Sequence, residues 1–159
     1  MSVLIKFLTR GSPPHWTDQV KSEVLAGIAT ERCRLVLQCA ALGQPEPLPD
    51  HLFTDVFKMQ RALGGGGESG EDHLGEAECL VLAEANGWGV ITDDNAAYDL
   101  ASKRLGSART HDTIDILHAL VAHGDLEAIE AKQLTDAIRN NGRYLRRVHP
   151  TTLIPDYFR

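Results

Sequence analysis

The sequence predicts an α/β protein in which a parallel central sheet is covered by helices on both faces. Segments with helical periodicity alternate along the chain with short runs of β-branched and apolar residues, which is typical of parallel sheets. Glycines stand directly after several of the helical segments, where they favour helix ends. The length of 159 residues suits a single compact domain, so we expect one domain over residues 1–159.

The composition is that of an ordinary globular protein, with 43% apolar and 24% charged residues. No apolar run approaches the roughly 20 residues needed to cross a bilayer, so we expect no membrane partner. Cys33, Cys39 and Cys79 form no CxxC pair, and the start of the chain lacks the pattern of a signal peptide. We therefore expect a reduced, cytoplasmic protein. The net charge of −6 argues against nucleic-acid binding through overall positive charge, but not through a local basic patch.

The first helix is expected to begin at Thr17 or Asp18, because either side chain can serve as its N-cap. Apolar residues between Val20 and Ile28 follow at helical spacing. This pattern ends near Thr30, which predicts a helix of about three turns.

The next segments alternate between a β-type run, a loop, a helix and a second loop. Residues 34–38 form a short β-type run, followed by a loop with proline and glycine over residues 43–49. Asp50 is expected to cap a helix that extends to Leu63. Four consecutive glycines open the stretch Gly64 to Asp72, which predicts a mobile loop.

The second half of the chain has the clearest pattern. An amphipathic helix closes at Gly87, a short buried strand follows, and the next helix ends at Gly106. The expected helices cover residues 74–86, 96–105, 113–122 and 126–139, and the expected strands cover residues 88–92 and 151–154.

Two aspartates follow the strand of residues 88–92. In open parallel sheets, ligands bind at the carboxyl ends of the strands, and Asp93 and Asp94 are expected there. One aspartate is enough to cap the next helix, so the second is a candidate for a functional site.

Glu76 lies in the first turn of the helix over residues 74–86, where a carboxylate also complements the helix dipole. A helix, turn and strand between Glu76 and Asp94 can bring the helix start near the strand end. Two carboxylates in that position repel each other unless a cation lies between them, and sites made only of oxygen suit Mg²⁺ or Mn²⁺. Taken alone, Glu23 is typical of a solvated helix position and Asp112 of an N-cap.

The stretch from Leu74 to Asp94, LGEAECLVLAEANGWGVITDD, resembles the signature of PIN domains. In that family an acidic residue opens an alanine-rich helix, a glycine turn leads into a strand, and Thr-x-Asp closes it. Glu76 falls on the helix acid and Asp94 on the Thr-x-Asp acid. Val20 to Gly27 resembles the earlier helix that carries another acid of the metal site, which places Glu23 there. The region around Gly124 fits the C-terminal part of the family.

One feature of the family is missing from this sequence. PIN domains usually begin with a strand that ends in Asp-Thr/Ser-x-Val-Leu-Ile, whereas residues 2–8 resemble only the segment after that aspartate. The chain then starts late, or it is a degenerate member without a central strand and a metal ligand. In a third alternative, residues 3–8 are themselves the first strand. No acid occupies the first position in any of these cases.

The resemblance implies a three-layer α/β/α fold with a parallel central sheet, whose first strand is missing or altered. It also implies a hydrolase, a magnesium- or manganese-dependent endoribonuclease of the toxin type that is paired with an antitoxin protein. The metal would be bound by Glu23, Glu76 and Asp94, with Asp93 and Asp112 as auxiliary ligands. Family members often dimerise, so a homodimer is a further expected partner. The alternative is a catalytically degenerate PIN-like module that binds nucleic acid or protein.

RNA contacts are expected from basic side chains, because these can neutralise phosphates even in a chain with net negative charge. The most basic stretch contains a tyrosine that can stack on a base. A second group lies nearer to the acidic residues in the sequence. The candidates are Arg143, Arg146 and Arg147 in the first group, and Lys103, Arg104 and Arg109 in the second.

Overall fold

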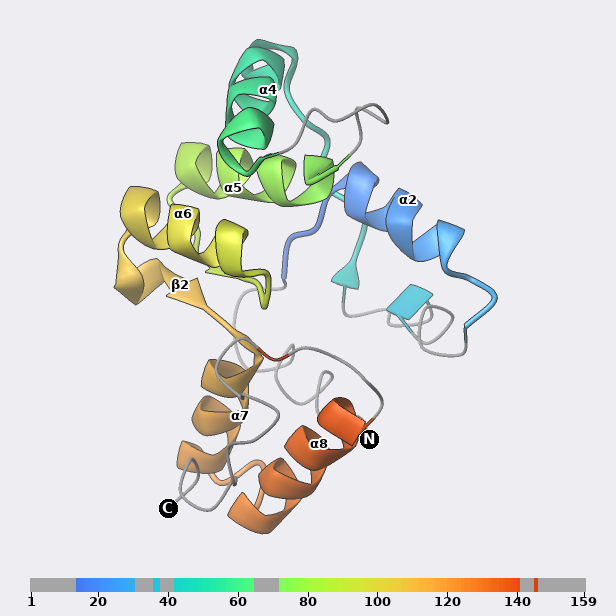
Figure 1. Ribbon diagram of the computed structural model, residues 1–159, viewed down its shortest axis with the longest axis vertical. Helices are drawn as coiled ribbons and strands as arrows, with labels where there is room; N and C mark the ends of the chain where they lie inside the picture. The colour runs from blue at the N-terminus through green and yellow to red at the C-terminus, as the bar shows by residue number, and fades with distance from the viewer. Residues whose placement is uncertain (1–13, 31–35, 38–41, 65–71, 141–144, 146–159) are drawn as a thin grey trace. The chain divides into compact units, whose positions relative to one another are not determined.

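The computed structural model describes residues 14–30, 36–37, 42–64, 72–140 and 145 (Figure 1). Its helices are α2 (Asp18–Ala26), α4 (Phe53–Ala62), α5 (Leu74–Asn86), α6 (Asn95–Leu105), α7 (Thr113–Ala122) and α8 (Ala128–Asn140). Its strands are β1 (Val90–Ile91) and β2 (Thr110–His111), and its short 3-10 helices are η2 (Asp50–Leu52) and η3 (Ser107–Arg109). The chain divides into two compact units, which we call the N-terminal unit (Ser2–Val90) and the C-terminal unit (Ile91–Arg159).

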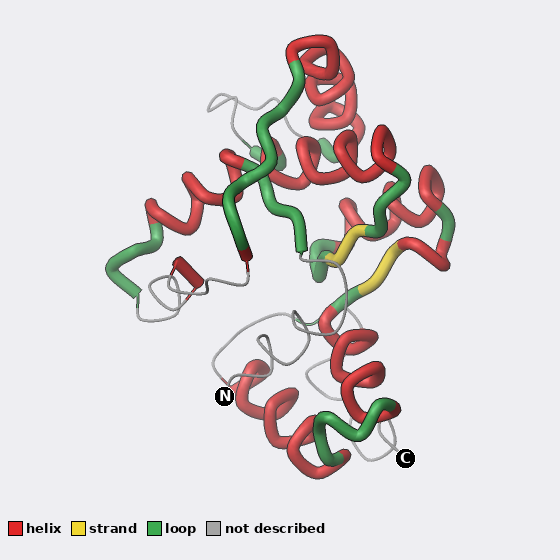
Figure 2. The backbone as a smooth tube through the Cα atoms, turned by 180° about the vertical axis from the view of Figure 1, so that it is seen from behind, coloured by secondary structure: helices red, strands yellow, loops and turns green. Residues whose placement is uncertain are grey.

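The sheet is small beside the helices (Figure 2). β1 and β2 pair in parallel, and the backbone N–H of Thr92 donates to the carbonyl of His111 at 2.9 Å. Within the described residues, these two strands make up the whole sheet. The predicted α/β class is confirmed in this coarse form, with helices forming most of the structure.

The core of the N-terminal unit lies between α4 and α5, which pack against each other (Figure 1). Both helices supply apolar side chains at helical spacing, and each fully buried valine, leucine or methionine stabilises the fold by about 1.5–3 kcal/mol. The buried apolar residues are Val56, Met59 and Leu63 from α4 and its end, and Ala77, Leu80, Val81, Leu82 and Ala83 from α5.

The segment before α2 is held by contacts with residues far along the chain. The carbonyl of Trp16 accepts a hydrogen bond from the N–H of Glu46 at 2.7 Å, and Thr17 forms a parallel bridge with Glu46. The His15 ring pairs with the Glu46 carboxylate at 2.7 Å and stacks on Trp88, with ring centroids 3.8 Å apart. These contacts fix the start of α2 within the N-terminal unit.

The C-terminal unit consists of α6, η3, β2, α7 and α8. α6 packs on η3 and β2, and α7 packs on α8. The buried apolar residues of this unit are Ala97, Ala101, Ile114, Leu117, Leu120, Leu126, Ala131 and Leu145. No helix in the described part of the chain has the length and apolar character needed to span a membrane.

Several predicted helix ends are confirmed. α5 covers the residues expected and ends at Gly87, whose φ of 72° places it in the left-handed region that favours glycine. α7 has the expected bounds, and Thr17 is the N-cap of α2, accepting a hydrogen bond from the N–H of Val20 at 3.2 Å. α2 ends at Ala26 and not near Thr30.

Other predictions were wrong. Of the β-type run over residues 34–38, only Val36 and Leu37 are described, and their backbone is helical. Asp50 does not cap α4, because η2 comes first and Leu52 is the residue before the helix. The strand after Gly87 is shorter than expected, and only Val90 is buried, since Ile91 is 49% exposed.

α8 begins two residues later than predicted, at Ala128, and the strand β2 was not predicted. Three further predictions lie outside the described residues: a first strand within residues 3–8, the loop over residues 65–71, and a strand over residues 151–154.

Candidate functional site

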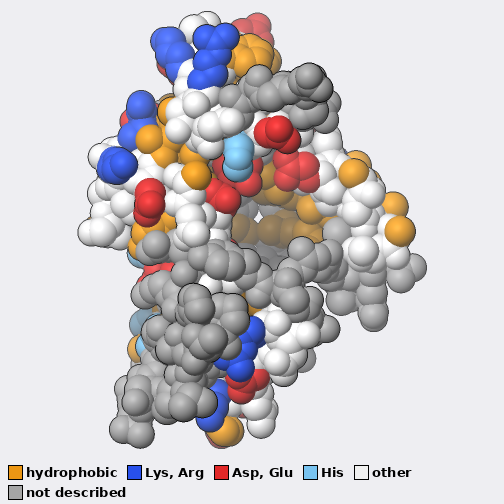
Figure 3. Space-filling view, viewed as in Figure 1, with side chains coloured by type: hydrophobic (Ala, Val, Ile, Leu, Met, Phe, Trp, Pro, Cys, Tyr) orange, Lys and Arg blue, Asp and Glu red, His pale blue; other side chains and the backbone are white. Residues whose placement is uncertain are grey.

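The carboxylate of Glu23 lies against the first turn of α5. Gly75 is buried there, and a Cβ built on it would lie 2.8 Å from Glu23 Oε1. The side chain of Glu23 therefore reaches from α2 to the backbone of α5, in the turn that also carries Glu76. Acidic side chains gather where α2 and α5 meet (Figure 3).

The surroundings of Glu23 disfavour its ionised form. Burial raises the pKa of the Glu23 carboxyl above its usual value, and the charges of Glu76 and Glu78 raise it further. A hydrogen bond from the Gln19 side chain opposes this pKa shift. No ion pair within the described residues joins a basic side chain to Glu23 or Glu76. The start of α5 is therefore a place where negative charge accumulates.

The side chains of Thr17 and Cys79 interact, which links the start of α2 to α5. The hydroxyl of Thr17, which is 2% exposed, is hydrogen-bonded to the thiol of Cys79. Burial raises the pKa of Cys79 to about 12, and Glu78 and Glu76 contribute in the same direction. The thiol is thus protonated at neutral pH and is a structural group. Sequence reasoning missed this contact, although Cys79 stands three residues after Glu76, at a spacing that shares a helix face.

The start of α5 is also held from α4. His73, the residue before the helix, has φ 60° and ψ 19°, a left-handed conformation that is uncommon for histidine, and its side chain makes no capping bond. The side-chain amide of Gln60, which is 3% exposed, donates to the carbonyl of Asp72 at 2.9 Å. Gln60 therefore fixes the turn from which Glu76 is presented. No local sequence pattern indicates this role.

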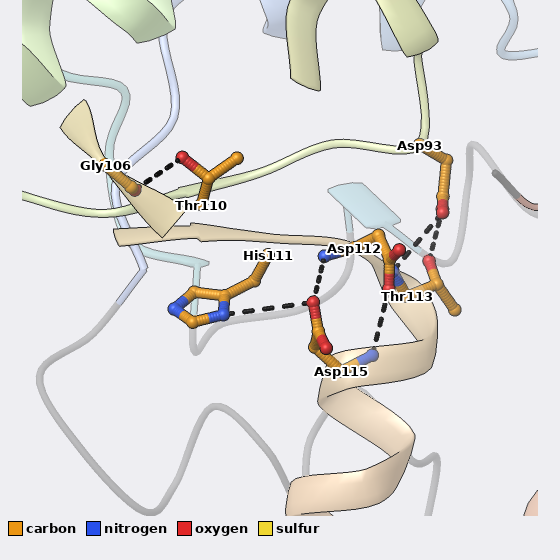
Figure 4. A network of polar contacts seen from close by, with 7 residues as sticks. All are labelled: Asp93, Gly106, Thr110, His111, Asp112, Thr113 and Asp115. Carbon is orange, nitrogen blue, oxygen red and sulfur yellow. Dashed lines mark hydrogen bonds and ion pairs between the residues drawn. The ribbon is translucent and has the colours of Figure 1, made fainter. Parts of the chain in front are cut away.

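Asp93 and Asp94, which follow β1, both bind backbone N–H groups of helices. Asp94 is the N-cap of α6, and its carboxylate accepts from the N–H of Ala97 at 2.8 Å. Asp93 accepts from the N–H of Thr113 at 3.3 Å and from the hydroxyl of the same residue (Figure 4). Asp93 thus connects the end of β1 to the start of α7.

Asp112 is the N-cap of α7 and forms a reciprocal capping box with Asp115 (Figure 4). The N–H of Asp115 donates to Asp112 Oδ1 at 3.0 Å, and the N–H of Asp112 donates to Asp115 Oδ2 at 3.0 Å. Asp112 is 0% exposed, and His111 Nδ1 lies 3.9 Å from Asp115 Oδ2. The capping role that the sequence allowed for Asp112 accounts for its position.

The basic candidates of the second group belong to the C-terminal unit. Lys103 and Arg104 lie in the last turn of α6, where positive charge also complements the helix dipole, and Arg109 ends η3. Those of the first group, Arg143, Arg146 and Arg147, lie outside the described residues.

The structure therefore groups the acidic candidates by unit. Glu23 and Glu76 come together in the N-terminal unit, whereas Asp93, Asp94 and Asp112 belong to the C-terminal unit. The described residues contain no group of three histidine, cysteine, aspartate or glutamate side chains placed to hold a metal ion. A pair of carboxylates still fits Mg²⁺ in its donor chemistry, because this ion is usually held by one or two carboxylates and fills its other positions with water and substrate phosphates.

Comparisons with protein-family models, with curated proteins and with solved structures found no match. The similarity to PIN domains accordingly remains a similarity of sequence pattern.

Proposed function

We propose that this protein is a Mg²⁺- or Mn²⁺-dependent endoribonuclease of the PIN type, a toxin whose activity an antitoxin protein controls. The observation that supports this function best is the placement of the Glu23 carboxylate against the first turn of α5, where burial and the neighbouring charge of Glu76 raise its pKa. Carboxylates that repel each other at one place are typical of cation sites, because a bound cation removes the repulsion.

The residues of the chain have separate roles in this proposal. Glu23 and Glu76 hold the ion, and the PIN pattern adds Asp94 as a further acid. The ion, when bound, supplies an activated water and stabilises the charge on the scissile phosphate. The side chain of Gln19 orients the Glu23 carboxylate through its hydrogen bond. The candidate contacts to the phosphates of RNA are Lys103, Arg104 and Arg109.

A second function, a regulatory module that binds RNA or protein without catalysis, is favoured by one observation. Asp93, Asp94 and Asp112 all accept hydrogen bonds from backbone N–H groups at helix starts. Each has a structural role that requires no metal, so their presence alone does not indicate catalysis.

Cleavage of RNA separates the two functions. Purified full-length protein is incubated with fluorescent single-stranded RNA and Mn²⁺. We expect Glu76→Gln and Asp94→Asn each to slow cleavage by at least about tenfold. Glu84→Gln makes the same change at an exposed position of α5 and should leave the rate unchanged. Equal rates for the wild type, Glu76→Gln and Asp94→Asn would rule out the nuclease function, and RNA binding without cleavage would support the regulatory module.

A further inference from the structure

Gly75 occupies a position where the backbone does not require glycine. It is the second residue of α5 and lies within the regular helix, outside the left-handed conformations that favour glycine. Alanine is more favourable than glycine in a helix, because glycine loses more conformational freedom on folding. The presence of glycine here therefore needs another explanation.

The neighbour of Gly75 supplies one. A Cβ at this position would lie 2.8 Å from Oε1, 3.4 Å from Cδ and 3.4 Å from Oε2 of Glu23, so it would meet the whole carboxylate. The Glu23 carboxylate thus occupies the space that a side chain at residue 75 would fill. Glu76 follows directly in the same turn.

We propose that Gly75 is the positioning residue of this site: its missing side chain lets the Glu23 carboxylate lie on the first turn of α5, beside Glu76. The start of α2 is held in place, because Thr17, its N-cap, forms a bridge with Glu46 and the helix packs on α5. The carboxylate is the free end of a flexible side chain, so it swings away from an added methyl group while the helices stay in place. Gly75→Ala then preserves the fold and separates the two carboxylates.

The consequence for cation binding rests on the proposed function. Repositioning a group that orients a metal ligand typically weakens metal affinity 10–100-fold. We expect Gly75→Ala to weaken Mn²⁺ binding by the full-length protein about tenfold. Adding Glu23→Asp shortens the acidic side chain by one methylene and makes room for the methyl group, so the double variant Gly75→Ala/Glu23→Asp should recover most of this loss. A purely structural role for Gly75 would give no such rescue.

The experiment makes two measurements. Mn²⁺ binding is monitored through the electron paramagnetic resonance of the free ion, and melting temperatures are measured for a double-mutant cycle. The cycle compares Gly75→Ala in the wild type and in Glu23→Ala. We expect Gly75→Ala to raise the melting temperature more in the Glu23→Ala background, where the methyl group meets no carboxylate. Circular dichroism checks that each variant is folded.

The melting temperatures decide this inference even if the proposed function fails. A wild type that binds no Mn²⁺ would remove the metal site, yet unequal effects of Gly75→Ala in the two backgrounds would still support the positioning role. Equal effects in both backgrounds overturn it, as does undiminished Mn²⁺ affinity of Gly75→Ala in a protein whose wild type binds the ion.

Discussion

In the C-terminal unit, carboxylates accept hydrogen bonds from backbone N–H groups at helix starts, whereas in the N-terminal unit the Glu23 carboxylate lies against Gly75 and is repelled by the charge of Glu76. Asp94 and Asp112 cap α6 and α7, and Asp93 accepts two hydrogen bonds from Thr113. Burial and neighbouring negative charge raise the pKa of Glu23.

This difference separates two roles of acidic residues that look alike in the sequence. A carboxylate at a helix start satisfies N–H groups that lack partners within the helix, so it stabilises the fold without a ligand. Two carboxylates brought together from different helices repel each other, and this repulsion favours the binding of a cation. The contrast predicts that changes at Asp93 and Asp112 weaken the fold, while changes at Glu23 and Glu76 alter binding and pH dependence.

The reactivity of Cys79 should show the burial of its thiol first and the negative charge at the start of α5 second, and this is the largest effect we expect. Its pKa of about 12, against an ordinary 9.0, means that its thiolate is about a thousandfold rarer at pH 8 than that of an ordinary thiol. In a Cys33→Ser/Cys39→Ser background, alkylation by iodoacetamide should be slower by about this factor in the native protein than in urea. Adding Glu76→Gln and Glu78→Gln should speed the native reaction. Alkylation at the unfolded rate in native protein would contradict the buried, acidic surroundings of the thiol.

Asp112→Ala should lower the free energy of unfolding by about 2 kcal/mol. It removes a buried N-cap and leaves the N–H of Asp115 without its acceptor. Urea denaturation at pH 7 measures the loss, and Asp112→Asn, which retains an acceptor oxygen, should lose less. An unchanged midpoint for Asp112→Ala would show that the cap does not stabilise α7.

The bonds from Thr113 to Asp93 should contribute about 1 kcal/mol to folding. A double-mutant cycle with Asp93→Ala and Thr113→Val isolates the part that involves the hydroxyl, and we expect the two changes to be less than additive. Strict additivity would mean that this connection between β1 and α7 is not formed in solution.

Glu23→Gln should have the smallest effect on stability, and an effect of the opposite sign. Because the folded-state pKa of Glu23 is raised, ionisation of this group disfavours folding at neutral pH. The variant should therefore be more stable than the wild type at pH 7, by about 0.5 kcal/mol or less for so exposed a group.

The advantage of Glu23→Gln should disappear as the pH falls through the raised pKa to below the ordinary carboxyl value, where the wild-type side chain is protonated. Unfolding free energies measured between about pH 3 and pH 8, a range that spans the ordinary carboxyl pKa, follow this trend. A variant that is less stable than the wild type at pH 7 would contradict the repulsion.

Local patterns in the sequence predicted the helices well where the ends are marked. Gly87 stops α5 and Thr17 starts α2, because each of these residue types favours its position through its own backbone or side-chain chemistry. At Val36 and Leu37 the backbone is helical where the apolar run predicted a strand, since a short apolar run is compatible with either structure.

The candidate site was predictable in its residue types and less so in its contacts. The PIN-like pattern singled out Glu23 and Glu76, and the structure brings these two together. The sequence pattern gave no indication of the three contacts that hold the site, which involve Gly75, Gln60 and the Thr17 hydroxyl. These contacts join residues far apart in the chain, and such pairings leave no periodic trace in a single sequence.

Mn²⁺ binding to the full-length protein shows whether Glu23 and Glu76 form a cation site. The electron paramagnetic resonance of free Mn²⁺ is followed during titration of the wild type, Glu23→Gln, Glu76→Gln and the control Glu84→Gln. We predict that the wild type and Glu84→Gln bind the ion with equal affinity, and that Glu23→Gln and Glu76→Gln each bind it at least about tenfold more weakly. A wild type that does not bind Mn²⁺, or a Glu76→Gln variant with undiminished affinity, would refute a cation site at these two carboxylates.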